Sequence, residues 1–325
     1  MTIENSNRLS TLITEAASNG DVVLVVGTGE KRVRVCSGVL KIASKYFTAL
    51  LGPHFNEGHD IGGNEPKEVM MPYDNAKALE IICNVIHLRN DVVPKSLDSA
   101  DILDIAITAD KFDCIVALKH VSTIWLNPKE KETVMGLGNL MAAAYILNDP
   151  QAFSDITRAM IFHHKDSYLL LTDSDVVLVD ILPWKVFGKY YCAIFLLEER
   201  RSQLRTELLQ IILKGATDAG TDDNGNCKCA WSSRHSLVYL DLLRIQEINP
   251  SQILNTTISH VITRLEQMND PVVSGTQCSY RWHSTPSYRS QRSWRLETFM
   301  KSNGLCIDCL RFGTTAVEQN CRIKH

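Results

Sequence analysis

The feature that most constrains the fold of this sequence is a short apolar run followed by a segment that alternates basic and apolar residues. The run, residues 22–26, consists of consecutive Val and Leu residues. It is too short to span a membrane, and its β-branched side chains predict a buried strand. The alternating segment, residues 31–36, predicts a half-exposed hairpin partner. Ser37 is expected to cap a helix over residues 38–51, with Val39, Ala43, Phe47 and Leu50 on one face.

The pattern continues to residue 126 with a loop, a third strand and further helices. Residues 52–68 are polar and rich in Gly, and residues 69–72 form a short strand that ends in Pro72. Helices are expected over residues 76–88, 99–111 and 114–126, where apolar residues recur at helical spacing. This succession, with the phrase Ile105-Ala106-Ile107-Thr108-Ala109-Asp110-Lys111-Phe112, resembles a BTB/POZ domain over residues 21–126. Cys36-Ser37 stands where that family often carries His.

The resemblance implies an α+β fold, in which a small mixed sheet is clad by helices, and a protein that binds other proteins without catalysis. The domains that it predicts are an N-terminal helix (1–20), a BTB/POZ domain (21–126), a helical extension (127–215) and a helical, Cys-bearing C-terminal region (216–325). BTB domains commonly pair through their N-terminal helix and first strand. Residues 1–20 supply only a short helix, so we expect a weak homodimer.

The composition is that of an ordinary globular protein. The chain of 325 residues has a net charge of −3 and 45% hydrophobic residues, so charge alone favours neither nucleic acid nor an anionic membrane. No apolar stretch approaches the ~18 residues of a spanning helix, and residues 1–6 lack the start of a secretory leader. We therefore expect an intracellular protein, in the cytoplasm or nucleus, whose ten cysteines are mostly thiols or metal ligands.

The clustering of cysteines near the C-terminus favours a metal site. Six of the ten lie after residue 226, as Cys227-Lys228-Cys229, Cys278, Cys306-Ile307-Asp308-Cys309 and Cys321. A Cys-x-x-Cys turn supplies two thiolates to a tetrahedral zinc ion. The predicted ligands of a structural zinc are Cys229, Cys278, Cys306 and Cys309, with Cys227 as the alternate for Cys229. The arrangement is similar to a Cys pattern in a group of fungal BTB proteins. Ordinary buried thiols and a redox pair remain as alternatives.

Other site chemistries are disfavoured by the residues present. Residues 222–226 are rich in Asp and Asn, but a calcium loop needs Gly where Cys227 stands. His235 and His283 could each replace one zinc thiolate, although a single core or surface His is the more common role. Gly27-Thr28-Gly29 lacks the third Gly of a dinucleotide-binding loop, and neither a Gly-x-Ser-x-Gly nor a His-Glu-x-x-His motif is present. The sequence predicts no catalytic site.

The last part of the chain is basic. Residues 271–325 hold eight basic and three acidic residues, a net charge of +5, whereas the remainder carries −8. Aromatic residues alternate with Arg in Tyr280-Arg281-Trp282, Tyr288-Arg289 and Arg292-Ser293-Trp294-Arg295, which would suit phosphate contacts and base stacking. A helix with inward aromatics and solvated or paired Arg explains the same pattern, and we favour it. The alternative function is a nuclear transcription regulator that uses this Cys-rich region on DNA.

One short motif suggests a partner for the BTB-like block. BTB domains that recruit cullin scaffolds often carry a hydrophobic-x-Glu motif in the loop after the helix that matches residues 38–51, and Phe55-Asn56-Glu57 occupies that place. An exposed Phe beside a carboxylate could dock in a partner's groove, whereas the alternative is a Phe55 that folds back on its own core. The predicted function is a non-enzymatic protein-interaction module, a substrate adaptor for a cullin-type ubiquitin ligase, with Phe55 and Glu57 binding the partner.

Overall fold

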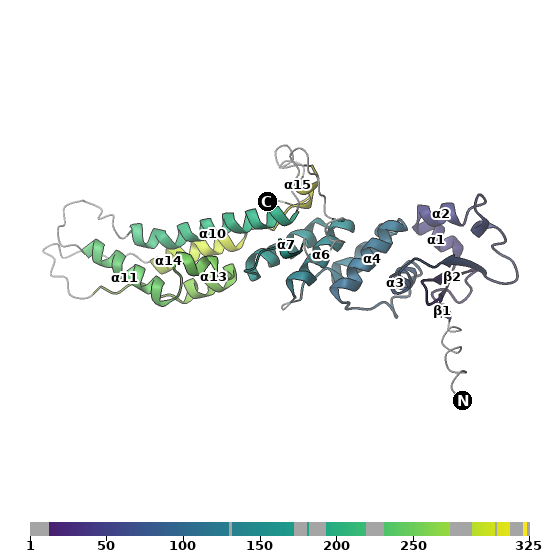
Figure 1. Cartoon of the computed structure of the whole chain (residues 1–325), viewed down its shortest axis with the longest axis horizontal. Coiled ribbons are helices and arrows are strands. Elements are labelled where there is room, and N and C mark those ends of the chain that lie inside the picture. Colours follow the sequence, from purple (N-terminus) through teal and green to yellow (C-terminus); the bar gives the residue numbers. More distant parts are fainter. Residues whose placement is uncertain are drawn as a thin grey trace, which may run out of the picture. The chain divides into compact units, whose positions relative to one another are not determined.

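The computed structural model describes residues 13–129, 132–171, 181, 193–218, 231–273, 288–302, 304–312 and 321–323. The chain divides into two compact units, residues 1–156 and residues 157–325 (Figure 1). Among the described residues, no helix combines the length and the apolar character needed to cross a membrane.

The first unit contains a four-stranded sheet of order β1-β3-β2-β4. The strands are β1 (Ile13–Glu15), β2 (Val22–Val26), β3 (Lys31–Val35) and β4 (Lys67–Met71). Strands β2 and β3 pair antiparallel, with Val22 opposite Val35, so the predicted hairpin is confirmed. Strand β4 pairs parallel with β2, and β1 pairs parallel with β3. Because β2 lies inside the sheet, all its side chains are buried, which explains its unbroken apolar sequence.

Residues 13–15 form a strand, so the prediction of a helix over residues 1–20 is wrong for this segment. Ile13 and Thr14 are β-branched, and Glu15 lies beside Arg34 in the ladder with β3. The chain then passes so close to β3 that a Cβ on Gly20 would lie 2.4 Å from the carbonyl oxygen of Val35. Gly20 therefore permits a close backbone approach and does not end a helix. Residues 1–12 lie outside the described residues.

The first unit also contains helices beside the sheet. They are α1 (Ser37–Ala43), α2 (Lys45–Leu50), α3 (Ala76–Ile86), α4 (Ser99–Lys111), α5 (Ile115–Trp125) and α6 (Val134–Ile146). Helix α3 packs against β3, α4 and α5 pack against α3, and α6 packs against α4. The helix predicted over residues 38–51 is divided at Ser44. The Ser44 hydroxyl accepts a hydrogen bond from the amide of Phe47 at 3.0 Å and donates one to the carbonyl oxygen of Phe112 at 2.6 Å. Because the helix is divided, its buried apolar residues are Leu40, Phe47 and Leu51. Of the face predicted for a single helix, only Phe47 is buried.

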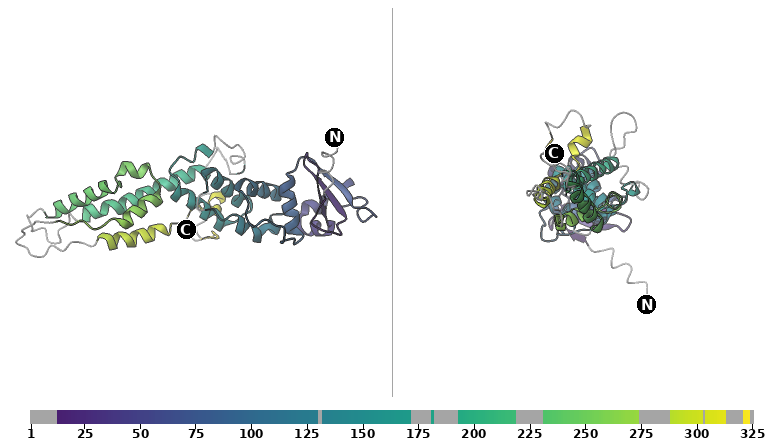
Figure 2. Two further views of the ribbon diagram at one scale, coloured as in Figure 1. Left: turned by 90° about the horizontal axis from the view of Figure 1, so that it is seen from below. Right: turned by 90° about the vertical axis from the view of Figure 1, so that its left-hand side faces the viewer.

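The second unit is a bundle of helices around α10. Helix α7 (Pro150–His163) contains the boundary between the units, and the helices that follow are α10 (Ala193–Asp218), α11 (Trp231–Ile245), α12 (Pro250–Leu254), α13 (Ile258–Gln267), α14 (Tyr288–Met300) and α15 (Ile307–Phe312). Helix α10 packs against α11, α12 and α14, and α14 packs against α13 (Figure 2). The fully buried apolar residues of α10 are Ala193, Ile194, Leu197, Leu204, Leu208 and Ile212.

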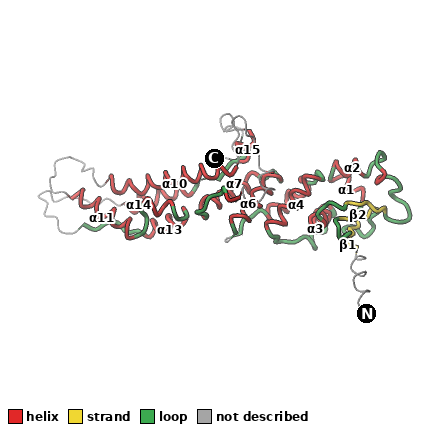
Figure 3. Tube along the Cα trace, in the orientation of Figure 1, coloured by secondary structure: helices red, strands yellow, loops and turns green. Residues whose placement is uncertain are grey.

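The strands are confined to the first unit in the described part of the chain, and the second unit is helical there (Figure 3). The predicted α+β fold is therefore confirmed: a small mixed sheet clad by helices, followed by a helical, Cys-bearing region.

Candidate functional site

The loop between α2 and β4 presents Phe55 at the surface. The 3-10 helix η2 (Asn56–Gly58) follows Phe55 directly, and the amide of Gly58 donates a hydrogen bond to the Phe55 carbonyl at 3.0 Å. A Cβ on Gly58 would lie 1.9 Å from the carbonyl oxygen of Gly52, so the backbone at these two residues meets and closes the first part of the loop, residues 53–57. Phe55 is 50% exposed, and it is therefore not a core residue.

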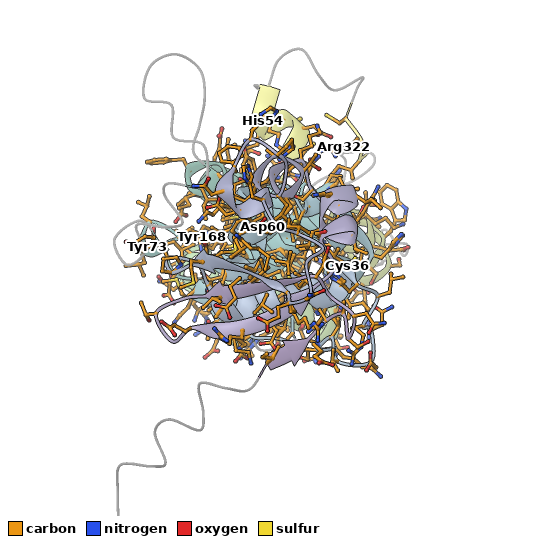
Figure 4. All side chains as sticks on the ribbon, turned by 90° about the vertical axis from the view of Figure 1, so that its right-hand side faces the viewer. Cys36, His54, Asp60, Tyr73, Tyr168 and Arg322 are labelled. Atoms are coloured by element: carbon orange, nitrogen blue, oxygen red, sulfur yellow. The ribbon has the colours of Figure 1, made fainter. Side chains whose placement is uncertain are left out.

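The surroundings of Phe55 form one face of the first unit. Glu57 is half-buried in η2, which packs against the edge strand β4. The ring of His59 lies 3.0 Å from the carbonyl oxygen of Pro53, which further ties the loop together. Figure 4 looks onto this side of the unit, with the loop residues His54 and Asp60 labelled. Tyr73, which is 95% exposed, lies at a different edge of the same face.

Cys36 and Ser37, at the end of β3 and the start of α1, take part in a hydrogen-bond network. The amide and hydroxyl of Ser37 donate to the two carboxylate oxygens of Asp21 at 2.7 and 2.6 Å. Burial alone would raise the pKa of Asp21, but these bonds outweigh it and the pKa is lowered. The amide of Cys36 donates to Nε2 of His87 at 3.0 Å. This pair of residues therefore joins the end of β3 to the start of β2 and to the end of α3.

Three cysteines meet in the second unit. The Sγ atoms of Cys306, Cys309 and Cys321 all lie within 4.8 Å of one another, and those of Cys309 and Cys321 are 3.5 Å apart. A disulfide would place the sulfurs about 2.05 Å apart, so these residues are thiols. Burial and the neighbouring thiols raise the pKa of Cys309, and burial raises that of Cys321.

The cluster includes only part of the predicted ligand set. It brings Cys306 and Cys309 together, at the start of α15, where a turn was predicted. Cys229, Cys278 and the alternate Cys227 lie outside the described residues. Sequence reasoning did not include Cys321, because its distance from Cys309 along the chain matches no short ligand motif.

Residues adjacent to the three cysteines have their own contacts. The carboxylate of Asp308, which is 5% exposed, accepts a hydrogen bond from the Arg322 amide at 2.9 Å and one from the Arg322 guanidinium at 2.7 Å. The Arg322 hydrogen bonds lower the pKa of Asp308. On the other side of the cluster, the amide of Leu305 donates to the Thr157 hydroxyl at 2.8 Å. The chain is thus fixed immediately beside each cysteine.

Two arginines of the basic region have structural roles. Arg292 is 4% exposed, and its guanidinium donates to the carbonyl oxygens of Leu265, at 3.0 Å, and Met268. Arg322 is held by Asp308. Tyr288 is buried, as the helical interpretation expects, whereas Trp294 is 67% exposed. Tyr280-Arg281-Trp282 and His283 lie outside the described residues.

His235 is a core residue of the second unit. It is fully buried on α11, and its ring centroid lies 5.3 Å from that of Tyr288. Burial lowers its pKa. In the part of the chain that the structure describes, His235 is not in the cysteine cluster.

The first unit therefore has the architecture of a binding module: a small sheet clad by helices, with an ordered loop that displays an aromatic side chain. Residues 13–126 match the BTB/POZ domain family, so the chain contains a BTB/POZ domain, which includes β1. No curated protein gives a significant match to the sequence. BTB/POZ domains typically bind proteins, among them second copies of themselves and cullin scaffolds, and do not catalyse reactions. The chain thus carries a protein-interaction module.

Proposed function

We propose that this protein is a substrate adaptor for a cullin-type ubiquitin ligase, and that Phe55 and Glu57 bind the scaffold. The observation that carries the proposal is the half-exposed Phe55 in a segment that is closed by the approach of Gly52 to Gly58. A large aromatic side chain at the surface of a protein-interaction domain is a typical binding anchor.

The loop geometry supports binding energetically. Because Phe55 is half-buried already, burial of the rest of its side chain would stabilise a complex by about 1 kcal/mol. Because the loop is already closed by the Gly58 hydrogen bond and by the contact between Gly52 and Gly58, little chain entropy is lost when a partner binds. The Glu57 carboxylate, two residues from Phe55, supplies an acceptor that gives the contact a direction.

In this proposal the two units have separate tasks. The BTB/POZ domain binds the scaffold and a second copy of the chain, as a weak homodimer, while the helical unit holds a client protein. A structural zinc ion supports the Cys-bearing end of the helical unit. The protein works inside the cell, in the cytoplasm or nucleus, where cysteines stay reduced. DNA binding is not proposed, because Arg292 and Arg322 are engaged within the protein.

The experiment is co-purification of a cullin-type scaffold with the tagged full-length chain. We compare the natural chain with Phe55→Ala, Glu57→Ala and the double variant. Tyr73→Ala is the matched control, because it removes a more exposed aromatic side chain of the same unit, away from the loop. The melting temperature of each variant is measured alongside.

The expected result is loss of the scaffold from the double variant, with both the melting temperature and the Tyr73→Ala complex unchanged. Undiminished recovery of scaffold with the double variant would refute the role of these residues. A large drop in melting temperature for Phe55→Ala would instead assign Phe55 to the core and would remove the basis of the proposal.

A further inference from the structure

We propose that Cys306, Cys309 and Cys321 form a metal site that holds a zinc ion through their three thiolates. This set differs from the one predicted by Cys-x-x-Cys spacing, because Cys321 takes part in it. The inference depends on the geometry of the second unit alone, so it stands or falls independently of the Phe55 and Glu57 contact.

The distances between the sulfur atoms fit a zinc ion. With Zn–S bonds of about 2.3 Å and tetrahedral angles, two thiolates on one ion lie about 3.8 Å apart. The Cys309 and Cys321 sulfurs are 3.5 Å apart, and no pair in the trio exceeds 4.8 Å. Shifts of a few tenths of an ångström to about 1 Å would bring all three onto one ion, which is within reach of Cys side-chain rotation.

The site is built by the residues that adjoin the ligands. Asp308 and Arg322, the neighbours of Cys309 and Cys321, are joined by one backbone and several side-chain hydrogen bonds. Leu305, the neighbour of Cys306, is bound to Thr157 of α7. These contacts use no cysteine atom, so they bring the three sulfurs together independently of any metal. A preformed arrangement of this kind raises affinity, because little ordering is needed on binding.

Three cysteines favour a soft metal ion. Thiolates prefer zinc or copper(I) to magnesium or calcium, and zinc has no redox chemistry to consume the ligands. Each thiol must lose its proton to bind, so the zinc ion replaces three protons, which pass to solvent. The fourth tetrahedral position is then left for water or a partner's side chain.

The experiment measures zinc in the full-length chain, purified under reducing conditions. About one zinc per chain is expected by elemental analysis, and Cys306→Ser, Cys309→Ser and Cys321→Ser should each lose it. Cys36→Ser is the matched control, because it removes a half-buried thiol from the other unit and should keep the metal. Cys321→Ser is the decisive variant: zinc retained in it would overturn the proposal in favour of ligands elsewhere.

Cobalt substitution keeps the proposal testable if a serine variant folds poorly. The natural chain should show sulfur-to-cobalt charge-transfer absorption, and Cys321→His should keep the metal with roughly one third less of that absorption, because one of three thiolates is lost. Unchanged absorption would exclude Cys321 as a ligand.

Two further outcomes would also overturn the proposal. One is a natural chain that holds no zinc although its thiols are reduced, which would show that the three thiols do not bind the ion. The other is an unchanged protease resistance of the second unit after zinc is removed with a chelator, since a bound ion would stabilise the segment that it closes.

Discussion

The backbone amide of Cys36 donates a hydrogen bond to Nε2 of His87, over 3.0 Å, across a separation of 51 residues in the chain. The other ring nitrogen, Nδ1, lies 2.8 Å from the carbonyl oxygen of Cys83. Since Nε2 accepts, the ring must be neutral, with its proton on Nδ1. Protonation of Nε2 would break the link between β3 and α3.

This link makes the stability of the BTB/POZ domain dependent on pH. Burial lowers the pKa of His87 below its ordinary value of 6.5. The unfolded chain therefore binds a proton before the folded chain does. His87 therefore leaves the free energy of unfolding unaffected above about pH 6.5. As the pH falls from there to the lowered pKa of the folded chain, the free energy of unfolding decreases by about 1.4 kcal/mol for each pH unit between the unfolded and folded pKa values.

We expect His87→Gln to weaken this dependence, because the Gln carbonyl can accept from Cys36 but does not titrate. Urea unfolding at about pH 7.5 and about pH 5 measures the difference in free energy. His120→Gln is the control, since His120 is exposed on α5. A slope equal to that of the natural chain in His87→Gln would contradict the assignment.

Gly58→Ala should disrupt the loop that carries Phe55. A Cβ at this position would lie 1.9 Å from a backbone oxygen of Gly52, so the loop must open. We expect a loss of about 1–3 kcal/mol in the free energy of unfolding and weaker recovery of the proposed cullin-type scaffold. Gly29→Ala is the control, because no atom lies within 4 Å of its added Cβ. Equal stability of the two variants would show that the contact is not rigid.

Arg292→Ala should destabilise the second unit. Its guanidinium donates two hydrogen bonds to carbonyl oxygens at the end of α13, and their loss costs roughly 3 kcal/mol, at about 1.5 kcal/mol each. Arg289→Ala, on the exposed face of the same helix, should cost little. Thermal melting separates the two. If Arg292→Ala kept its stability but lost salt-dependent retention on DNA, the nucleic-acid interpretation would replace the structural one.

The BTB/POZ domain should pair weakly with a second copy. Self-association must overcome the loss of translational and rotational freedom of the two chains. Light scattering over a concentration series should therefore show a mass that rises from one chain toward two. A constant mass of one chain at the highest concentration would contradict the prediction.

Most of the BTB/POZ fold could be predicted because its local patterns agree with its tertiary contacts. Strand β2 is an unbroken apolar run because it is buried on both faces, and α4 begins and ends at the predicted residues, Ser99 and Lys111. Ser44 divides the first predicted helix through its bond to Phe112, a residue 68 positions away. A hydrogen-bond partner so far along the chain cannot be predicted from the sequence around Ser44.

The candidate sites, too, depend on contacts that the local sequence pattern does not reveal. The Phe55 motif was found because its residues are consecutive, and its exposure could not be known before the closing contact of Gly52 and Gly58 was seen. Cys321 was missed because its approach to Cys309 depends on the ion pair of Asp308 with Arg322. Spacing rules detect ligands that share a turn, and they do not detect ligands that a separate contact brings together.

The backbone contact between Gly52 and Gly58 separates the sequence of the intervening segment from the packing of the domain. Its ends are fixed by glycines, and its side chains from Pro53 to Asn56 are exposed, so they have no core to fill. Substitutions there change the surface that the domain presents at little cost to folding. The surface of this segment and the stability of the domain can therefore vary separately, and the segment could be exchanged between related domains as a unit.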